Sequence, residues 1–208
     1  MDGKDLRMNS TVTRPVAVGI ALLAAAVGCG GDDAGQDLSA APTGVRWQDY
    51  QGIALPQTDQ GPATVAQGAA TGFEHSPRGA GLAALTHTIR LSVAPDNQWA
   101  TVVNQEVVPG QARDEWAINR VQLSITGPAA PEYAPRLLGY KITEYRDEQS
   151  RIDVYTEYSD SSRAVNHTTV GWYGGDWRLQ LPDPLSTDRP VDAIDELPTD
   201  IVTLEAPQ

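Results

Sequence analysis

The sequence predicts an α+β domain in which about three N-terminal helices pack on a curved four-stranded antiparallel sheet. Between residues 76 and 123, apolar residues recur every three or four positions, which is the period of a helix packed on one face. After residue 135 the pattern changes to alternating segments rich in Val, Ile, Thr, Tyr and Trp, which are typical of strands. Short polar turns separate these segments, and helices followed by such strands form a layered fold.

The first predicted helix begins within residues 71–85, TGFEHSPRGAGLAAL, after short extended pieces in residues 47–75. Ser76 suits the N-cap position, and Pro77 suits the first helical position, where its missing N–H costs nothing. An apolar stripe follows before Pro95 ends the helix: Leu82, Leu85, Ile89 and Val93. Small residues in the first turns keep the helix slim, so we expect a sheet to approach closely there: Gly79, Ala80, Gly81, Ala83 and Ala84.

Two further helices are expected before the strands. Asp96 can cap the second helix, whose apolar face carries Trp99, Val102, Val103 and Val107. The dipeptide Pro109-Gly110 breaks that helix. Residues 111–123 then predict a third helix, with Trp116 and Leu123 on the same face.

Four strands are predicted, at residues 136–145, 151–159, 163–173 and 176–182. In the second of them, one side is expected to carry Ile152, Val154, Thr156 and Tyr158, and the other side Asp153, Tyr155 and Glu157. Gly174 and Gly175 supply the positive φ angles of a tight hairpin turn. The last segment, from residue 183, carries seven acids, one Arg and four Pro, so we expect it to be mostly disordered or pinned along the surface.

The composition bounds the function more than it defines it. A length of 208 residues suggests one domain with flanking segments. Acids outnumber bases 27 to 15, and this excess argues against a nucleic-acid surface, which needs clustered Lys and Arg. The single cysteine, Cys29, excludes a disulfide within the chain.

The N-terminal residues resemble a bacterial lipoprotein signal. A basic leader precedes an uncharged apolar run at residues 16–27, which is shorter than the about 20 residues a spanning helix needs. The run ends in Ala26-Val27-Gly28-Cys29, which resembles a lipobox with Ala in place of the usual Leu. This predicts lipidation of Cys29; a short uncleaved anchor or a plain signal peptide are the alternatives.

The predicted organisation has four parts. Residues 1–28 form a lipoprotein signal peptide, and residues 29–46 form a flexible tether. Residues 47–182 form the α+β domain, and residues 183–208 form an acidic, Pro-containing tail that contributes few core contacts. The expected location is the extracytoplasmic face of the cell membrane, with the body held by the lipid anchor.

The order of several short motifs resembles a family of actinobacterial envelope proteins that are associated with conjugative and integrative elements. The residues that carry the resemblance are Trp47, Leu55, Pro56, Gly61, Pro62, Gly72, Phe73, His75, Pro77, Gly79, Ala80, Ala83, Ala84, Pro109, Gly110, Arg113, Asp114, Asp176, Trp177, Arg178 and Leu179. The resemblance implies a cone-shaped, cystatin-like domain similar to those of type IV secretion scaffolds. It implies no catalytic residues. The resemblance implies relatives that are held by a transmembrane helix, and this chain departs from them with its lipobox.

Two positions stand out as candidate sites. His75 lies just before Ser76, and we interpret it as a residue that caps or packs at the helix start, since His87 and His167 show no metal-ligand spacing with it. Glu106 falls in the apolar stripe of the second predicted helix, where burial of a carboxylate is costly. Either the helix frays there and Glu106 reaches the rim, or Glu106 lies in a pocket in the mouth of the cone, near His87 or His167. In a filled core, Glu106 would be replaceable by Gln or Leu without loss of stability.

The motifs of hydrolases, nucleotide-binding proteins and zinc proteases do not occur in the sequence. We therefore predict no catalytic residue, no metal and no cofactor, and a binding or scaffold module with a protein partner in the envelope. The partner is expected on the sheet face around Tyr155, Glu157 and Trp172, or on the acidic tail. The alternative is a small-molecule-binding or acid–base catalytic pocket inside the cone.

Overall fold

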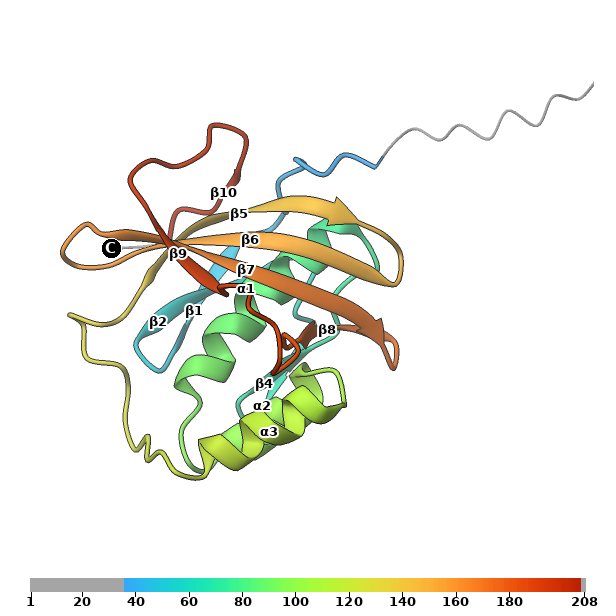
Figure 1. Ribbon diagram of the computed structural model, residues 1–208. Coiled ribbons are helices and arrows are strands. Elements are labelled where there is room, and N and C mark those ends of the chain that lie inside the picture. The colour runs from blue at the N-terminus through green and yellow to red at the C-terminus, as the bar shows by residue number, and fades with distance from the viewer. Residues whose placement is uncertain (1–35, 207–208) are drawn as a thin grey trace, which may run out of the picture. The chain divides into compact units, whose positions relative to one another are not determined.

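A computed structural model describes residues 36–206, which build a layer of helices against an antiparallel sheet (Figure 1). The sheet has six strands: β5 (Arg136–Tyr145), β6 (Gln149–Glu157), β7 (Arg163–Tyr173), β8 (Asp176–Gln180), β9 (Val191–Ile194) and β10 (Val202–Thr203). Its order is β10-β5-β6-β7-β8, and β9 pairs with β7 beside β8. In the view of Figure 1, α1 (Pro77–Val93) runs behind the strands.

The predicted fold class is therefore wrong in two respects. The sheet has six strands rather than four, because the tail supplies β9 and β10. The helices also do not come first among the described elements. They follow two hairpins, β1 (Arg46–Tyr50) with β2 (Ile53–Gln57), and β3 (Thr64–Ala66) with β4 (Ala69–Thr71).

Helix α1 is buried on almost all sides, because the sheet covers one side and the hairpins and α2 (Trp99–Glu106) cover another. Its N-terminus has the predicted cap, in which the Ser76 hydroxyl accepts a hydrogen bond from the Gly79 N–H at 3.2 Å. A Cβ atom at Gly81 would collide with the ring of Tyr140 on β5. The glycine thus permits the close approach of helix and sheet that the small residues predict.

The other two helices lie at the end of α1. Helix α2 packs against β4 and β8, and α3 (Gln111–Arg120) packs on α2. Asp96 does not cap α2. Its carboxylate instead accepts hydrogen bonds from Arg120, Ser124 and the Ile125 N–H, so it holds the segment after α3 against the end of α1.

The sheet has two different faces. On β6, Ile152 and Val154 lie in the main core under α1, whereas Tyr155 lies in a separate apolar cluster on the opposite, outer face. The β7–β8 turn uses Gly174 and Gly175 with φ of 65° and 85°, as predicted. The alternation predicted for β6 is thus present, and apolar side chains are buried on both faces of this strand.

Residues 191–206, which we call the strap, cover the outer face of the sheet. The strap starts as β9 on the edge of β7, crosses the sheet, and ends as β10 on the edge of β5. On the way, Ile194, Leu197 and Ile201 pack on an outer cluster formed by Leu138, Tyr155 and Val165. Val202 and Leu204 belong to the main core. The expectation that this segment contributes few core contacts does not hold.

Leu204 tests the strap. Its side chain is only 4% exposed, so Leu204→Ala should lower the free energy of unfolding by about 2–5 kcal/mol, through lost burial and the cavity left behind. Leu185→Ala is the matched control, because Leu185 is 88% exposed and should change stability by about 0.5 kcal/mol or less. Urea denaturation followed by tryptophan fluorescence gives both values. Equal, small effects in the two variants would show that the strap is not part of the cooperative core.

Candidate functional site

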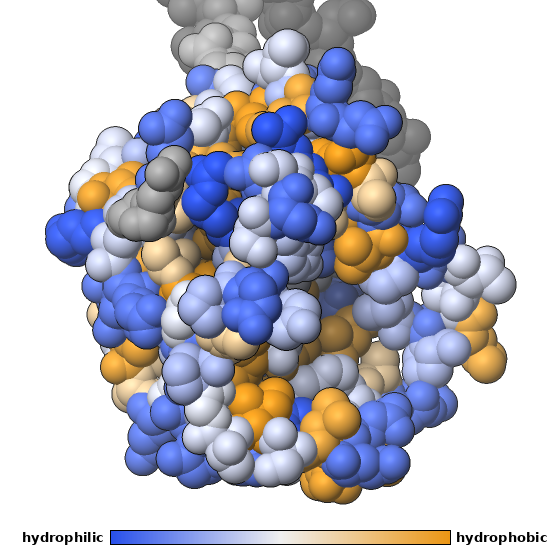
Figure 2. All heavy atoms as spheres, turned by 90° about the vertical axis from the view of Figure 1, so that its left-hand side faces the viewer, coloured by the Kyte–Doolittle hydropathy of each residue, from blue (hydrophilic) through white to orange (hydrophobic). Residues whose placement is uncertain are grey.

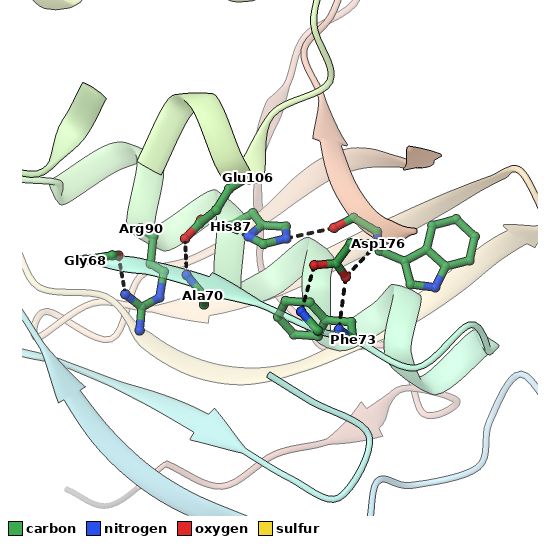
Figure 3. A network of polar contacts seen from close by, with 9 residues as sticks. Gly68, Ala70, Phe73, His87, Arg90, Glu106 and Asp176 are labelled. Carbon is green, nitrogen blue, oxygen red and sulfur yellow. Dashed lines mark hydrogen bonds and ion pairs between the residues drawn. The ribbon is translucent and has the colours of Figure 1, made fainter. Parts of the chain in front are cut away.

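The most unusual polar group in the interior is the pair formed by His87 of α1 and Glu106 at the end of α2 (Figure 3). His87 Nδ1 lies 2.8 Å from Glu106 Oε2, and the two side chains are 1% and 0% exposed. The other carboxylate oxygen accepts a hydrogen bond from the Ala70 N–H of β4 at 2.7 Å. Glu106 therefore neither frays nor reaches the rim. The sequence left two candidate partners, His87 and His167, and the structure brings His87 to Glu106.

The hydrogen-bond partners fix how many protons the pair holds. His87 Nε2 lies 3.0 Å from the carbonyl oxygen of Trp177 on β8, and a carbonyl only accepts, so Nε2 carries a hydrogen. One more proton must lie between Nδ1 and Oε2. Whether it sits on the imidazole or on the carboxyl group, the pair as a whole has no net charge. This neutrality makes complete burial tolerable.

Arg90, one turn after His87 on α1, extends this network. Its guanidinium donates to the carbonyl oxygen of Gly68 in the β3–β4 turn and lies 4.2 Å from the ring centroid of Tyr50. Burial lowers the pKa of Arg90, and the charge of Glu106 opposes that shift. Burial likewise raises the pKa of Tyr50 to about 12, so the phenol stays neutral beside the cation.

Asp176 forms the other end of the network (Figure 3). Its carboxylate accepts hydrogen bonds from the backbone N–H groups of Gly72 and Phe73, at 2.7 and 2.9 Å. The neighbouring Trp177 is fully buried, and its indole N–H donates to the carbonyl oxygen of Glu74 at 3.0 Å. β8 thus holds the segment that directly precedes α1. The sequence analysis assigned no functional role to Asp176. Its place directly after the Gly174-Gly175 turn is the signal that could have drawn attention to it.

The structure does not bring His167 to this network. His167 pairs with Asp153 across β6 and β7, and Asp153 alternates with the core residues Ile152 and Val154. Both side chains therefore point to the outer face. His167 Nδ1 lies 2.7 Å from Asp153, and Nε2 lies 3.3 Å from Asp192 of β9. The predicted combination of Glu106 with a histidine thus uses His87 alone.

An open groove lies around His167, between the outer face of the sheet and the segment 181–192. Its volume is about 810 Å³. Its lining combines charged and polar side chains with a few apolar ones: Thr143, Arg151, Ile152, Asp153, His167, Thr168, Thr169, Gln180, Leu181, Pro182, Asp183, Ser186, Thr187, Asp188, Arg189, Pro190 and Asp192. This outer groove is separate from the buried network of His87 and Glu106.

The residues expected to bind a partner do not form one surface. Tyr155 is only 3% exposed because the strap covers it, and burial raises its pKa to about 12. Glu157 binds Arg136 and Arg163, which lower its pKa. Trp172 points to the other face, against the main core. The left-hand side of the molecule in Figure 1 shows hydrophilic and hydrophobic side chains interspersed rather than one continuous apolar patch (Figure 2).

His75 packs rather than caps. Its ring stacks on Trp172 with centroids 3.9 Å apart and an interplanar angle of 11°. Its Nε2–H donates to the carbonyl oxygen of Asp147 at 2.6 Å, which ties the start of α1 to the β5–β6 turn. The histidine of the launching segment is thus a packing residue.

Two further findings concern the predicted anchor and metal sites. Cys29 lies outside the described residues. Within residues 36–206, no helix is long and apolar enough to cross a membrane, and no three His, Cys, Asp or Glu side chains are grouped so that they could hold a metal ion.

The buried pair makes a specific prediction. His87→Leu leaves the Glu106 carboxylate buried without the partner that shares its proton, and should lower the free energy of unfolding by about 3–5 kcal/mol. Glu106→Gln should cost much less, because the amide can donate to Nδ1 and still accept from Ala70. This replaces the expectation that Leu is tolerated at position 106, where it would leave His87 and Ala70 unpaired. Urea denaturation measures the free energy of unfolding of His87→Leu, Glu106→Gln and Glu106→Leu.

The control for these variants is Glu132→Leu, because Glu132 is exposed and should be near neutral. Equal losses for His87→Leu and Glu106→Gln would contradict the shared-proton arrangement.

His167 predicts a pH dependence. The hydrogen bond to Asp153 raises its pKa above 6.5, with a smaller contribution from Asp192, and burial opposes this. A raised pKa in the folded state stabilises the fold fully below the unfolded pKa, and the contribution is lost as the pH rises through the folded pKa. Arg151 and Arg189 also line this groove and stay charged throughout. The stability difference between wild type and His167→Gln, measured by urea denaturation from about pH 5 to about pH 9, should therefore shrink with rising pH. A constant difference would contradict the pairing.

The comparisons with known proteins give one match. Residues 12–199 match the model of a protein family described as "Domain of unknown function (DUF8175)". The matched residues include the apolar run, Cys29 and most of the folded region. No curated protein and no solved structure matches the chain. The match spans far more than half of the chain, so the protein belongs to the DUF8175 family.

Proposed function

We propose that this protein is a lipid-anchored, non-catalytic binding or scaffold module on the extracytoplasmic face of the bacterial cell membrane. The observation that carries the proposal is the N-terminal arrangement of a basic leader, a short apolar run and the only cysteine of the chain directly after two small residues. A diacylglyceryl group on Cys29 supplies two acyl chains, which is what stable anchoring requires. Its partner is a protein of the envelope.

The described acid–base residues support a non-catalytic role. His87 and Glu106 bind each other and the backbone, and both are almost completely buried. His167 has each ring nitrogen next to a carboxylate, so neither nitrogen is available as a general base. These side chains serve in positioning other elements. The rival function, an acid–base pocket around Glu106, is therefore not favoured.

The resemblance to envelope proteins of conjugative elements suggests the setting in which such a module works. We propose that it is an accessory of a conjugation or type IV secretion apparatus. An excess of acids over bases keeps the body from lying flat on an anionic membrane, which leaves its surface accessible to a protein partner.

Cys29→Ser tests the anchor. In a bacterial host, the wild-type protein should partition into the detergent phase of a Triton X-114 extraction, and its N-terminal peptide should carry a diacylglyceryl group by mass spectrometry. The Cys29→Ser protein should stay unmodified and lack that partition. An unmodified wild-type N-terminus would overturn the anchoring proposal.

Wild type and Cys29→Ser, introduced into a strain that lacks the protein, also test the role in conjugation. A donor strain that lacks the protein should transfer its conjugative element less efficiently, and the wild-type gene should restore the transfer. Cys29→Ser should restore it poorly, although the protein is made at the same level. Unchanged transfer in the deletion strain would reject the role in conjugation without affecting the anchor.

A further inference from the structure

The outer groove around His167 has a volume of about 810 Å³ and is separate from the buried network of His87 and Glu106. Its floor consists of side chains from β6 and β7, and its wall is the segment 181–192. At the border of floor and wall, Asp192 lies 3.3 Å from His167 Nε2, and the carbonyl oxygen of Pro190 accepts a hydrogen bond from the backbone N–H of His167 at 2.9 Å. These contacts attach the end of the wall to β7.

Four charged side chains of this groove form one linked set, whereas Arg151, Asp183 and Asp188, which also line it, form no ion pair with another lining residue. His167 binds Asp153 and Asp192, and Arg189 lies 3.2 Å from Asp192. An ionic ligand that bound to this linked set would have to break its pairs first. A hydroxyl group can instead add hydrogen bonds to them, because each carboxylate accepts several and each guanidinium donates up to about five. Side chains already fixed by their pairs lose little freedom when such a ligand binds.

The remaining lining has the same character. It offers hydroxyl and amide groups that both donate and accept: Thr143, Thr169, Gln180, Ser186 and Thr187. Leu181, Pro182 and Pro190 add apolar contacts on the same wall. A ligand that complements this lining carries many hydroxyl groups on one side and C–H groups on another. Pockets for drug-like ligands differ, since they are mostly apolar.

We propose that the outer groove binds a neutral oligosaccharide. Asp153, Asp192 and Arg189 would contact its hydroxyl groups, and His167 positions the two carboxylates. This inference does not depend on the lipid anchor, because it rests on the groove alone. It adds a ligand to the proposed binding function.

The test uses three neutral tetrasaccharides with the purified full-length protein in detergent: chitotetraose, maltotetraose and cellotetraose. Isothermal titration calorimetry should show binding of at least one of them, with an affinity that stays constant between about 50 mM and about 500 mM salt, because no ion pair forms. Arg189→Ala should weaken that binding by about tenfold or more, as expected when charge-assisted hydrogen bonds are lost.

Arg146→Ala is the matched control. Arg146 and Arg189 are 73% and 81% exposed, each binds one carboxylate, and Arg146 lies outside the groove. It should leave the affinity unchanged, and so should Cys29→Ser, which separates this test from that of the anchor. No binding of any tetrasaccharide, or equal affinity in Arg189→Ala, overturns the proposal. Binding only of polyphosphate or polylysine, with affinity that falls with salt, overturns it in favour of an ionic ligand.

Discussion

The arrangement of α1, α2, β4 and β8 depends on the contact between His87 and Glu106. One side chain comes from α1 and the other from α2, and their remaining polar atoms bind β8 and β4. Three consecutive elements therefore meet the distant strand β8 at one shared proton. In an apolar interior such a contact is sensitive to geometry, because each polar atom of the pair has a single partner. The pair thus fixes where these elements lie rather than adding much net stability.

Two neighbouring charged side chains also hold irregular segments in place. Arg90 holds the β3–β4 turn, and Asp176 holds the backbone just before α1. In each case, a charged side chain from a regular element binds backbone groups of an irregular segment. The short hairpins β1–β2 and β3–β4 have few strand neighbours, so these bonds and the main core keep them in place.

The sequence predicted those parts whose signals are local. α1 has its cap and stripe, and β5 and β7 are strands of ten and eleven residues, rich in β-branched and aromatic residues. The strap was missed because VDAI and VT are too short to show a period, and their stability comes from the free edges of β7 and β5. Glu106 stood out as a carboxylate among apolar residues, and its partner was narrowed to two histidines. Only the crossing of α1 and α2 decides between them. Tyr155 appeared exposed because a strand pattern cannot reveal what covers its outer face.

The path of the strap also bears on how the chain reaches its folded state. β10 joins β5 only after the chain has passed through β6, β7, β8 and β9, so the pairing is among the most non-local in the molecule. Until Ile194, Leu197 and Ile201 are present, Leu138, Tyr155 and Val165 remain uncovered on one side of an unfinished sheet. A chain that emerges N-terminus first therefore exposes these apolar, association-prone residues during its synthesis and any translocation. Folding of this domain must wait for its last elements, and a chaperone that shields β5–β7 in the meantime would protect it from association.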